Sequence, residues 1–164
     1  MHLPDEAAGS GRPPPAMSVR ARAVIPDDEG RILLDRTAHL DREAFYWLPG
    51  GGVEPGETAE EALRRELLEE AALRIEVGRL LYVSENLFVE SGEYRHEVIL
   101  YFLARIAGPS GGRPTDPRSH ELHAPDAVPG PLLPAEVARE VVVDLAGGFI
   151  RPVQHLVTDA RPAV

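Results

Sequence analysis

The chain has 164 residues, which suits one domain with a hydrophobic core. Its 27 acidic residues outnumber its 17 basic residues, and the net charge of −10 argues against a nucleic-acid partner. Cysteine is absent, which excludes disulfides, thiolate catalysis and cysteine-type zinc sites. No apolar run reaches membrane-spanning length and the start lacks the pattern of a signal peptide, so we expect a cytoplasmic protein without membrane contact.

The N-terminal segment is rich in proline, glycine and alanine. Residues 1–16 show no hydrophobic periodicity, and we expect a disordered leader there. Met17 follows directly and is a candidate for the biological start. We therefore expect a single folded domain over residues 17–164.

Short extended segments and turns follow this leader. Small or apolar residues alternate with arginine in Ser18–Ile25, which predicts a strand, and a second strand is predicted at Arg31–Arg36. The turn at Asp27–Gly30 separates them, so we expect a hairpin. A brief extended segment is expected at Tyr46–Pro49, after which the glycines and proline of Gly50–Glu57 should interrupt regular structure.

A helix with strong start signals is predicted at Ala59–Ala72. Thr58 and Glu61 have the spacing of a capping box, and the segment contains only residues that favour helices. Apolar residues recur every four positions and should face the core; they are Leu63, Leu67 and Ala71.

The same helix carries three carboxylates on one side, at Glu66, Glu69 and Glu70. Spacings of three and four residues place side chains on one helical face, where like charges repel by about 0.2–0.5 kcal/mol per exposed pair. Such a face is either a solvated surface or the ligand set of a cation. Hard cations such as Mg²⁺ prefer the oxygen ligands that clustered carboxylates supply.

Two long strands are predicted after the helix. Arg74–Val89 and Tyr94–Ile106 should form a hairpin across the turn at Glu90–Glu93. Val98–Ala104 is apolar on both faces, which predicts a central strand that is covered on both sides.

Glu97 lies at the entrance of this central strand and needs a partner for its charge. A metal ion would be one partner, and Arg95 or Arg105 would be another. The neighbouring His96 is expected to be a hydrogen-bonded strand residue rather than a catalyst. Trp47 is expected to pack in the core rather than to stack on a base.

The C-terminal part alternates between turn-rich and regular segments. The stretch Gly108–Pro131 is expected to be a lid or to contain an edge strand, for which His120–Ala124 is the candidate. Its histidines are not counted as site residues; they are His120 and His123. A last helix should end at Gly147–Gly148, and Arg151–Val157 is expected to add a terminal strand.

Eight residues of the loop and helix have a fixed spacing, namely Gly51, Glu57, Arg65, Glu66, Leu67, Glu69, Glu70 and Leu73. This spacing closely resembles the signature of the Nudix hydrolase family. Eight of its nine defined positions match, and Ala72 stands where the family has glycine. We expect that glycine to end the helix in a left-handed conformation, where alanine costs about 1 kcal/mol.

The resemblance implies the Nudix fold, an α/β/α sandwich of the α/β (α+β) class with a mixed central β-sheet. It also implies a Mg²⁺-dependent hydrolase, with Mn²⁺ as a substitute, that cleaves the pyrophosphate bond of a nucleoside diphosphate linked to another group X. The partner would be a small nucleoside diphosphate derivative, and a homodimer would be in keeping with family habit.

The resemblance further implies roles for individual residues. Glu66 and Glu70 are the expected metal ligands, with Glu69 sharing the metal or orienting water. Arg65 is similar to the family arginine that holds a glutamate in position. The structural positions of the loop are Gly51 and Glu57, of which Glu57 is expected to buttress the loop against the helix.

Three questions stay open at this point. The general base is Glu66, Glu69 or Glu97, because family members draw it from different places. The alternative function is a non-catalytic nucleotide- or metabolite-sensing protein on the same scaffold, although all the helix glutamates are present. A prenyl diphosphate isomerase would need a catalytic cysteine, by resemblance to that branch, and is excluded by composition. The sequence does not indicate the group X.

Overall fold

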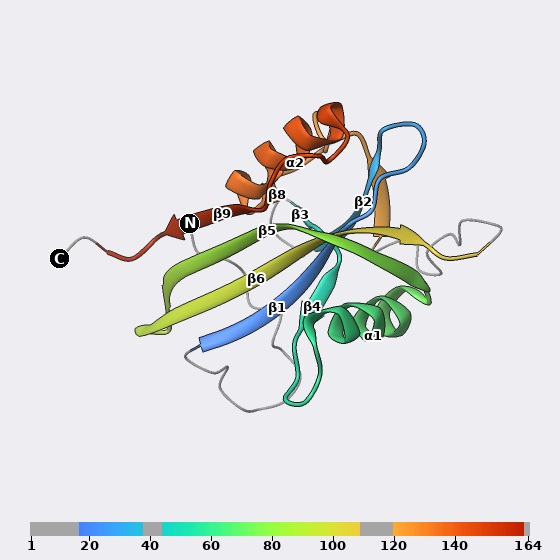
Figure 1. Cartoon of the computed structure of the whole chain (residues 1–164). Helices are drawn as coiled ribbons and strands as arrows, with labels where there is room; N and C mark the ends of the chain where they lie inside the picture. Colours follow the sequence, from blue (N-terminus) through green and yellow to red (C-terminus); the bar gives the residue numbers. More distant parts are fainter. Residues whose placement is uncertain (1–16, 38–43, 109–119, 163–164) are drawn as a thin grey trace.

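The computed structural model of the protein describes residues 17–37, 44–108 and 120–162. The predicted leader, residues 1–16, lies outside them. In the described part, two helices accompany two mixed sheets: α1 (Ala59–Ala71) and α2 (Ala135–Gly147). Figure 1 shows α2 on one side of the strands and α1 on the other. The predicted α/β/α sandwich is therefore confirmed.

The larger sheet contains the predicted central hairpin. Its strand order is β4 (Gly50–Gly52), β1 (Met17–Val24), β6 (Glu93–Ile106), β5 (Ile75–Glu90) and β9 (Gln154–Asp159). β5 and β6 pair antiparallel, whereas β1 runs parallel to β6 and β9 runs parallel to β5. The apolar strand β6 is central, as its sequence predicts, and the predicted terminal strand is β9.

The smaller sheet has the order β7 (His120–His123), β2 (Ile32–Thr37), β3 (Phe45–Trp47) and β8 (Leu132–Leu133). β7 confirms that the long turn-rich stretch contains an edge strand. It pairs antiparallel with β2, so that residues far apart in sequence become direct neighbours; one such pair is Asp35 and His120.

The predicted hairpin of the first two strands is wrong. β1 and β2 belong to different sheets and meet in one isolated bridge, between Pro26 and Ile32. Both edges of β1 are already paired, with β4 and with β6, so β2 has no edge to join. The glycine run was expected to interrupt regular structure, yet it forms the short edge strand β4.

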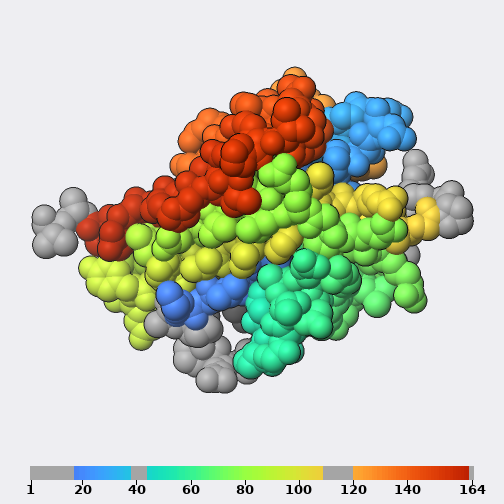
Figure 2. Space-filling view, in the orientation of Figure 1, coloured from blue at the N-terminus to red at the C-terminus, as the bar shows by residue number. Residues whose placement is uncertain are grey.

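Two hydrophobic clusters fill the opposite faces of the larger sheet. On β6, Ile99 and Tyr101 belong to the cluster under α2, whereas Phe102 and Ala104 belong to the cluster under α1. The predicted apolar stripe of α1 is buried in the second cluster. The space-filling view shows the strands between the orange-red α2–β9 layer and the teal-green segment that includes α1 (Figure 2). No helix within the described ranges is long and apolar enough to cross a membrane.

Candidate active site

Helix α1 is fixed at both ends by its own residues. At its start, the Thr58 hydroxyl accepts a hydrogen bond from the Glu61 N–H at 3.2 Å, and the Glu61 carboxylate accepts one from the Thr58 N–H at 2.7 Å. At its end, Ala72 adopts the left-handed conformation with φ 52° and ψ 28°. Leu73 N–H then donates to the Leu67 carbonyl at 3.0 Å, which closes the turn. Alanine therefore takes the conformation that we expected of the family glycine.

Arg65 joins the loop to the acidic side of α1. Its guanidinium donates to Glu57 at 2.7 and 3.2 Å and to the Gly52 carbonyl at 3.0 Å. Toward the helix it donates to Glu66 at 2.9 Å and, more weakly, to Glu69 at 3.4 Å. One planar cation thus ties Glu57 to the loop and orients Glu66, because its donors lie in a rigid fork.

The same contacts keep these groups charged. Hydrogen bonds from Arg65 lower the pKa of the Glu57 carboxyl, and the backbone N–H of Glu54 lowers it further. In return, the hydrogen bond to Glu57 raises the pKa of Arg65, and the bond to Glu66 adds to that effect. The pair is therefore ionised throughout the neutral range.

Gly51 makes room for Glu66. A Cβ at position 51 would lie 2.2 Å from the Glu66 carboxyl carbon, so the carboxylate occupies the space that any side chain there would need. Glu66 is mostly buried in this cradle, whereas the Glu69 side chain is 60% exposed. The loop and the arginine together hold one carboxylate in a defined place, as a metal ligand requires.

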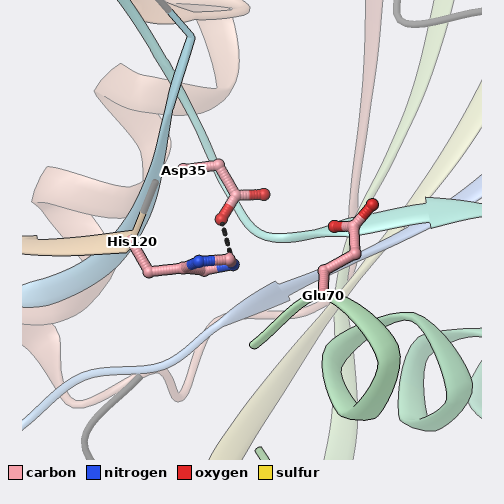
Figure 3. A group of neighbouring side chains, drawn as sticks. All are labelled: Asp35, Glu70 and His120. Carbon is pink, nitrogen blue, oxygen red and sulfur yellow. Dashed lines mark ion pairs between the residues drawn. The ribbon is translucent and has the colours of Figure 1, made fainter. Parts of the chain in front are cut away.

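Glu70 faces two residues that sequence reasoning missed. Its carboxylate points toward Asp35 on β2 and His120 on β7 (Figure 3). One ligand atom from each of the three lies within 4.8 Å of the others, and among the described residues this is the group of three that could hold a metal ion. Glu66 and Glu69 are not members of it. Asp35 and His120 become neighbours through the β2–β7 register, and no local motif signals them.

The structure does not bring Glu97 to the acidic side of α1. Alternation along β6 places Glu97 on the face of Ile99, under α2, and α1 covers the opposite face. Its partner is Arg20 on β1, with Nε and Oε1 3.0 Å apart. Neither of the expected arginines supplies this contact: Arg95 pairs with Glu90 at 3.3 Å, and Arg105 pairs with Glu76.

Two aromatic side chains named in the sequence analysis have structural partners. His96 lies with its Nε2 2.9 Å from Glu85 on the adjacent strand, in keeping with a hydrogen-bonded strand residue. Trp47 is buried, and the Arg22 guanidinium lies over its ring at 5.4 Å from the centroid.

A Gly-rich loop and a Glu-rich helix, joined by Arg65, thus lie together in an α/β/α sandwich. The family model of the NUDIX domain matches residues 17–145. The chain belongs to the NUDIX family.

Individual relatives agree with this assignment. The chain is similar to the Mus musculus 8-oxo-dGDP phosphatase NUDT18, with 31% identity over 137 residues that cover 81% of this chain and 40% of that protein. It is also similar to the crystal structure of the MutT NUDIX hydrolase from Burkholderia pseudomallei, with 33% identity, 77% and 98% coverage of the two chains, and a TM-score of 0.59. A NUDIX hydrolase structure from Nitrosomonas europaea shares the fold, with a TM-score of 0.63 at 20% identity and coverage of 88% and 79%. The chain spans about half or less of the length of the first relatives that it matches.

Proposed function

We propose that the protein is a divalent-metal-dependent hydrolase that cleaves the pyrophosphate bond of a small nucleoside diphosphate derivative. The observation that carries this proposal is the Glu66 carboxylate, held by Arg65 against Gly51. The names of two relatives, 8-oxo-dGDP phosphatase and RNA pyrophosphohydrolase, describe phosphate-ester or anhydride substrates and support the same chemistry. We keep the cytoplasm as the expected location and a homodimer as the expected assembly.

The donor set fits a hard divalent cation. Glu66, Glu69 and Glu70 offer carboxylate oxygens from one side of α1, which suits Mg²⁺, with Mn²⁺ as a substitute. A bound cation would withdraw charge from the phosphate oxygens and lower the pKa of a coordinated water. A protein with a net charge of −10 needs such a cation to accept an anionic substrate.

Two further roles are the positioning of these groups and the transfer of protons. Arg65 is a positioning residue, because its contacts are with carboxylates of the protein itself. Glu69 is the proposed general base: its side chain is exposed and its contact with Arg65 is long, at 3.4 Å, so it is free to accept a proton from water. Glu97 fits this role less well because Arg20 already holds its carboxylate.

A substrate panel tests the proposal. Nucleoside triphosphates, oxidised nucleotides, ADP-ribose, nucleotide sugars and dinucleoside polyphosphates would each be incubated with Mg²⁺ or Mn²⁺, and product release would be measured for the wild type and for Glu70→Gln. Metal-dependent cleavage of one class, lost in the variant, supports the proposal and identifies X. A flat panel in which nucleotides still bind would contradict it and favour a sensing protein on this scaffold.

A further inference from the structure

We propose that Asp35, Glu70 and His120 form a second cation site, which takes Mn²⁺ or a similar transition-metal ion in preference to Mg²⁺. The inference rests on the proposed function because the second site uses Glu70, which is also one of the helix carboxylates. It adds two ligands that the Nudix signature does not contain and a nitrogen donor that changes the choice of metal.

The spacing of the two strand residues suits a shared ion. Asp35 and His120 are direct partners in the β2–β7 register, and Asp35 Oδ1 lies 2.9 Å from His120 Nε2. Adjacent ligands around a cation with bonds of roughly 2.1 Å lie about 3 Å apart. The third ligand atom, on Glu70, lies within 4.8 Å of both.

The geometry of the contact between Asp35 and His120 also leaves room for a cation as a further partner. Although Asp35 Oδ1 is close to the imidazole nitrogen, it is a buried atom without a hydrogen-bond partner in the described part of the chain. The two atoms form an ion pair but do not meet the geometry of a hydrogen bond. A cation between Asp35, His120 and Glu70 would give this buried carboxylate oxygen a further partner.

The site is buried where the strands of the smaller sheet line it and exposed on the side of α1. The His120 side chain is 4% exposed and the Asp35 side chain 15% exposed, so the surrounding structure holds both side chains in place. Glu70 is exposed on the last turn of α1, which leaves a path for an ion and for water. Because Glu66 lies one helical turn earlier than Glu70 on the same helix, the second cation would lie beside the Glu66 carboxylate.

The ligand chemistry selects the ion. Two carboxylates and one neutral imidazole give a charge of −2, which a divalent cation balances. Mg²⁺ is bound mainly by oxygen, whereas imidazole nitrogen is a common ligand of zinc, copper, nickel and iron and is accepted by Mn²⁺ more readily than by Mg²⁺. A site with His120 in it should therefore discriminate against Mg²⁺.

Electron paramagnetic resonance of bound Mn²⁺ tests the site without any substrate. Pulsed spectra report hyperfine coupling to a ligating ¹⁴N nucleus, and loss of the free-ion signal during titration reports affinity. The test variant is His120→Gln. The matched control is His123→Gln, on the same strand, whose imidazole contacts Glu121 at 2.7 Å.

We expect ¹⁴N coupling in the wild type and in His123→Gln, and none in His120→Gln. Tight Mn²⁺ binding should weaken by about tenfold or more in His120→Gln and in Asp35→Asn. A wild type without ¹⁴N coupling at saturating Mn²⁺, or coupling that persists in His120→Gln, would overturn the inference. A wild-type spectrum without ¹⁴N coupling overturns the inference even when a variant does not fold. If the protein cleaves a substrate but shows no nitrogen coupling, this inference fails and the proposed function stands. If it shows nitrogen coupling but cleaves no substrate of the panel, the proposed function fails and this inference stands.

Discussion

A Cβ on Gly51 would lie 2.2 Å from the carboxyl carbon of Glu66 and within 2.6 Å of both carboxylate oxygens. The first glycine of the signature is thus required by the glutamate that it faces. Since the obstructing atoms are the end of a flexible side chain, a larger residue at this position would displace the carboxylate rather than break the fold. Gly51 is therefore tied to activity more closely than to stability.

Gly51→Ala should lower kcat/KM by about 100-fold or more, because a displacement of about 1 Å in a catalytic group has effects of that size. Its thermal unfolding temperature should change by only a few degrees. Steady-state kinetics and differential scanning fluorimetry measure the two effects.

The neighbouring glycines provide the controls for this variant. A Cβ on Gly52 meets nothing within 4 Å, so Gly52→Ala should leave both activity and stability unchanged. A Cβ on Gly50 would lie 2.1 Å from the Ala21 carbonyl oxygen, at a φ of +140°, so Gly50→Ala should destabilise the protein by about 2–4 kcal/mol. Wild-type turnover in Gly51→Ala would refute the assigned relationship.

Ala72→Gly should stabilise the protein. Ala72 has a φ of 52°, and a residue with a Cβ is strained in this left-handed conformation by about 1 kcal/mol relative to glycine. For a chain of this size we expect the melting temperature to rise by about 2–4 °C. Ala138→Gly, inside α2, is the comparison and should lower stability by about 0.5–1 kcal/mol. A lower melting temperature for Ala72→Gly would show that the helix end is not strained.

Glu57 should make stability depend on acid pH. Hydrogen bonds from Arg65 lower the pKa of Glu57 below its ordinary value of 4.5, so the carboxylate stabilises the folded state fully above about pH 4.5. That contribution is lost as the pH falls through the lower pKa of the folded state. The free energy of unfolding, measured in urea between pH 6 and pH 3, should be larger for the wild type than for Glu57→Gln at pH 6. The difference between the two proteins should shrink below pH 4.5. A difference that stays constant or grows in acid would contradict the assignment.

Glu69→Gln and Glu97→Gln should separate catalysis from structure. Removing the proposed base should lower kcat by about 10²–10⁴-fold at unchanged stability, with KM little affected. Glu97→Gln removes a charge partner of Arg20 and should instead cost about 1–2 kcal/mol of stability, with a smaller effect on kcat. The opposite pattern, with kcat lost in Glu97→Gln, would move the base to the central strand.

The features that the sequence predicted correctly depend on local signals. The capping pair Thr58 and Glu61 marks the start of α1, and the turn at Glu90–Glu93 joins β5 and β6. The choice of strand partners is not local, which is why the hairpin of β1 and β2 was predicted and is absent. The same reason hid Asp35, since it meets His120 only when the distant strands β2 and β7 pair in the smaller sheet.

The central claim is that Glu66 binds the cation on which hydrolysis depends. The most direct measurement is the Mg²⁺-dependent rate of Glu66→Gln on the substrate that the panel identifies, with Glu60→Gln as the control, because Glu60 lies on the same helix and pairs with Arg64 at 3.0 Å. We predict a rate about 10³-fold or more below the wild type for Glu66→Gln and an unchanged rate for Glu60→Gln. An unchanged Mg²⁺-dependent rate in Glu66→Gln would contradict the claim.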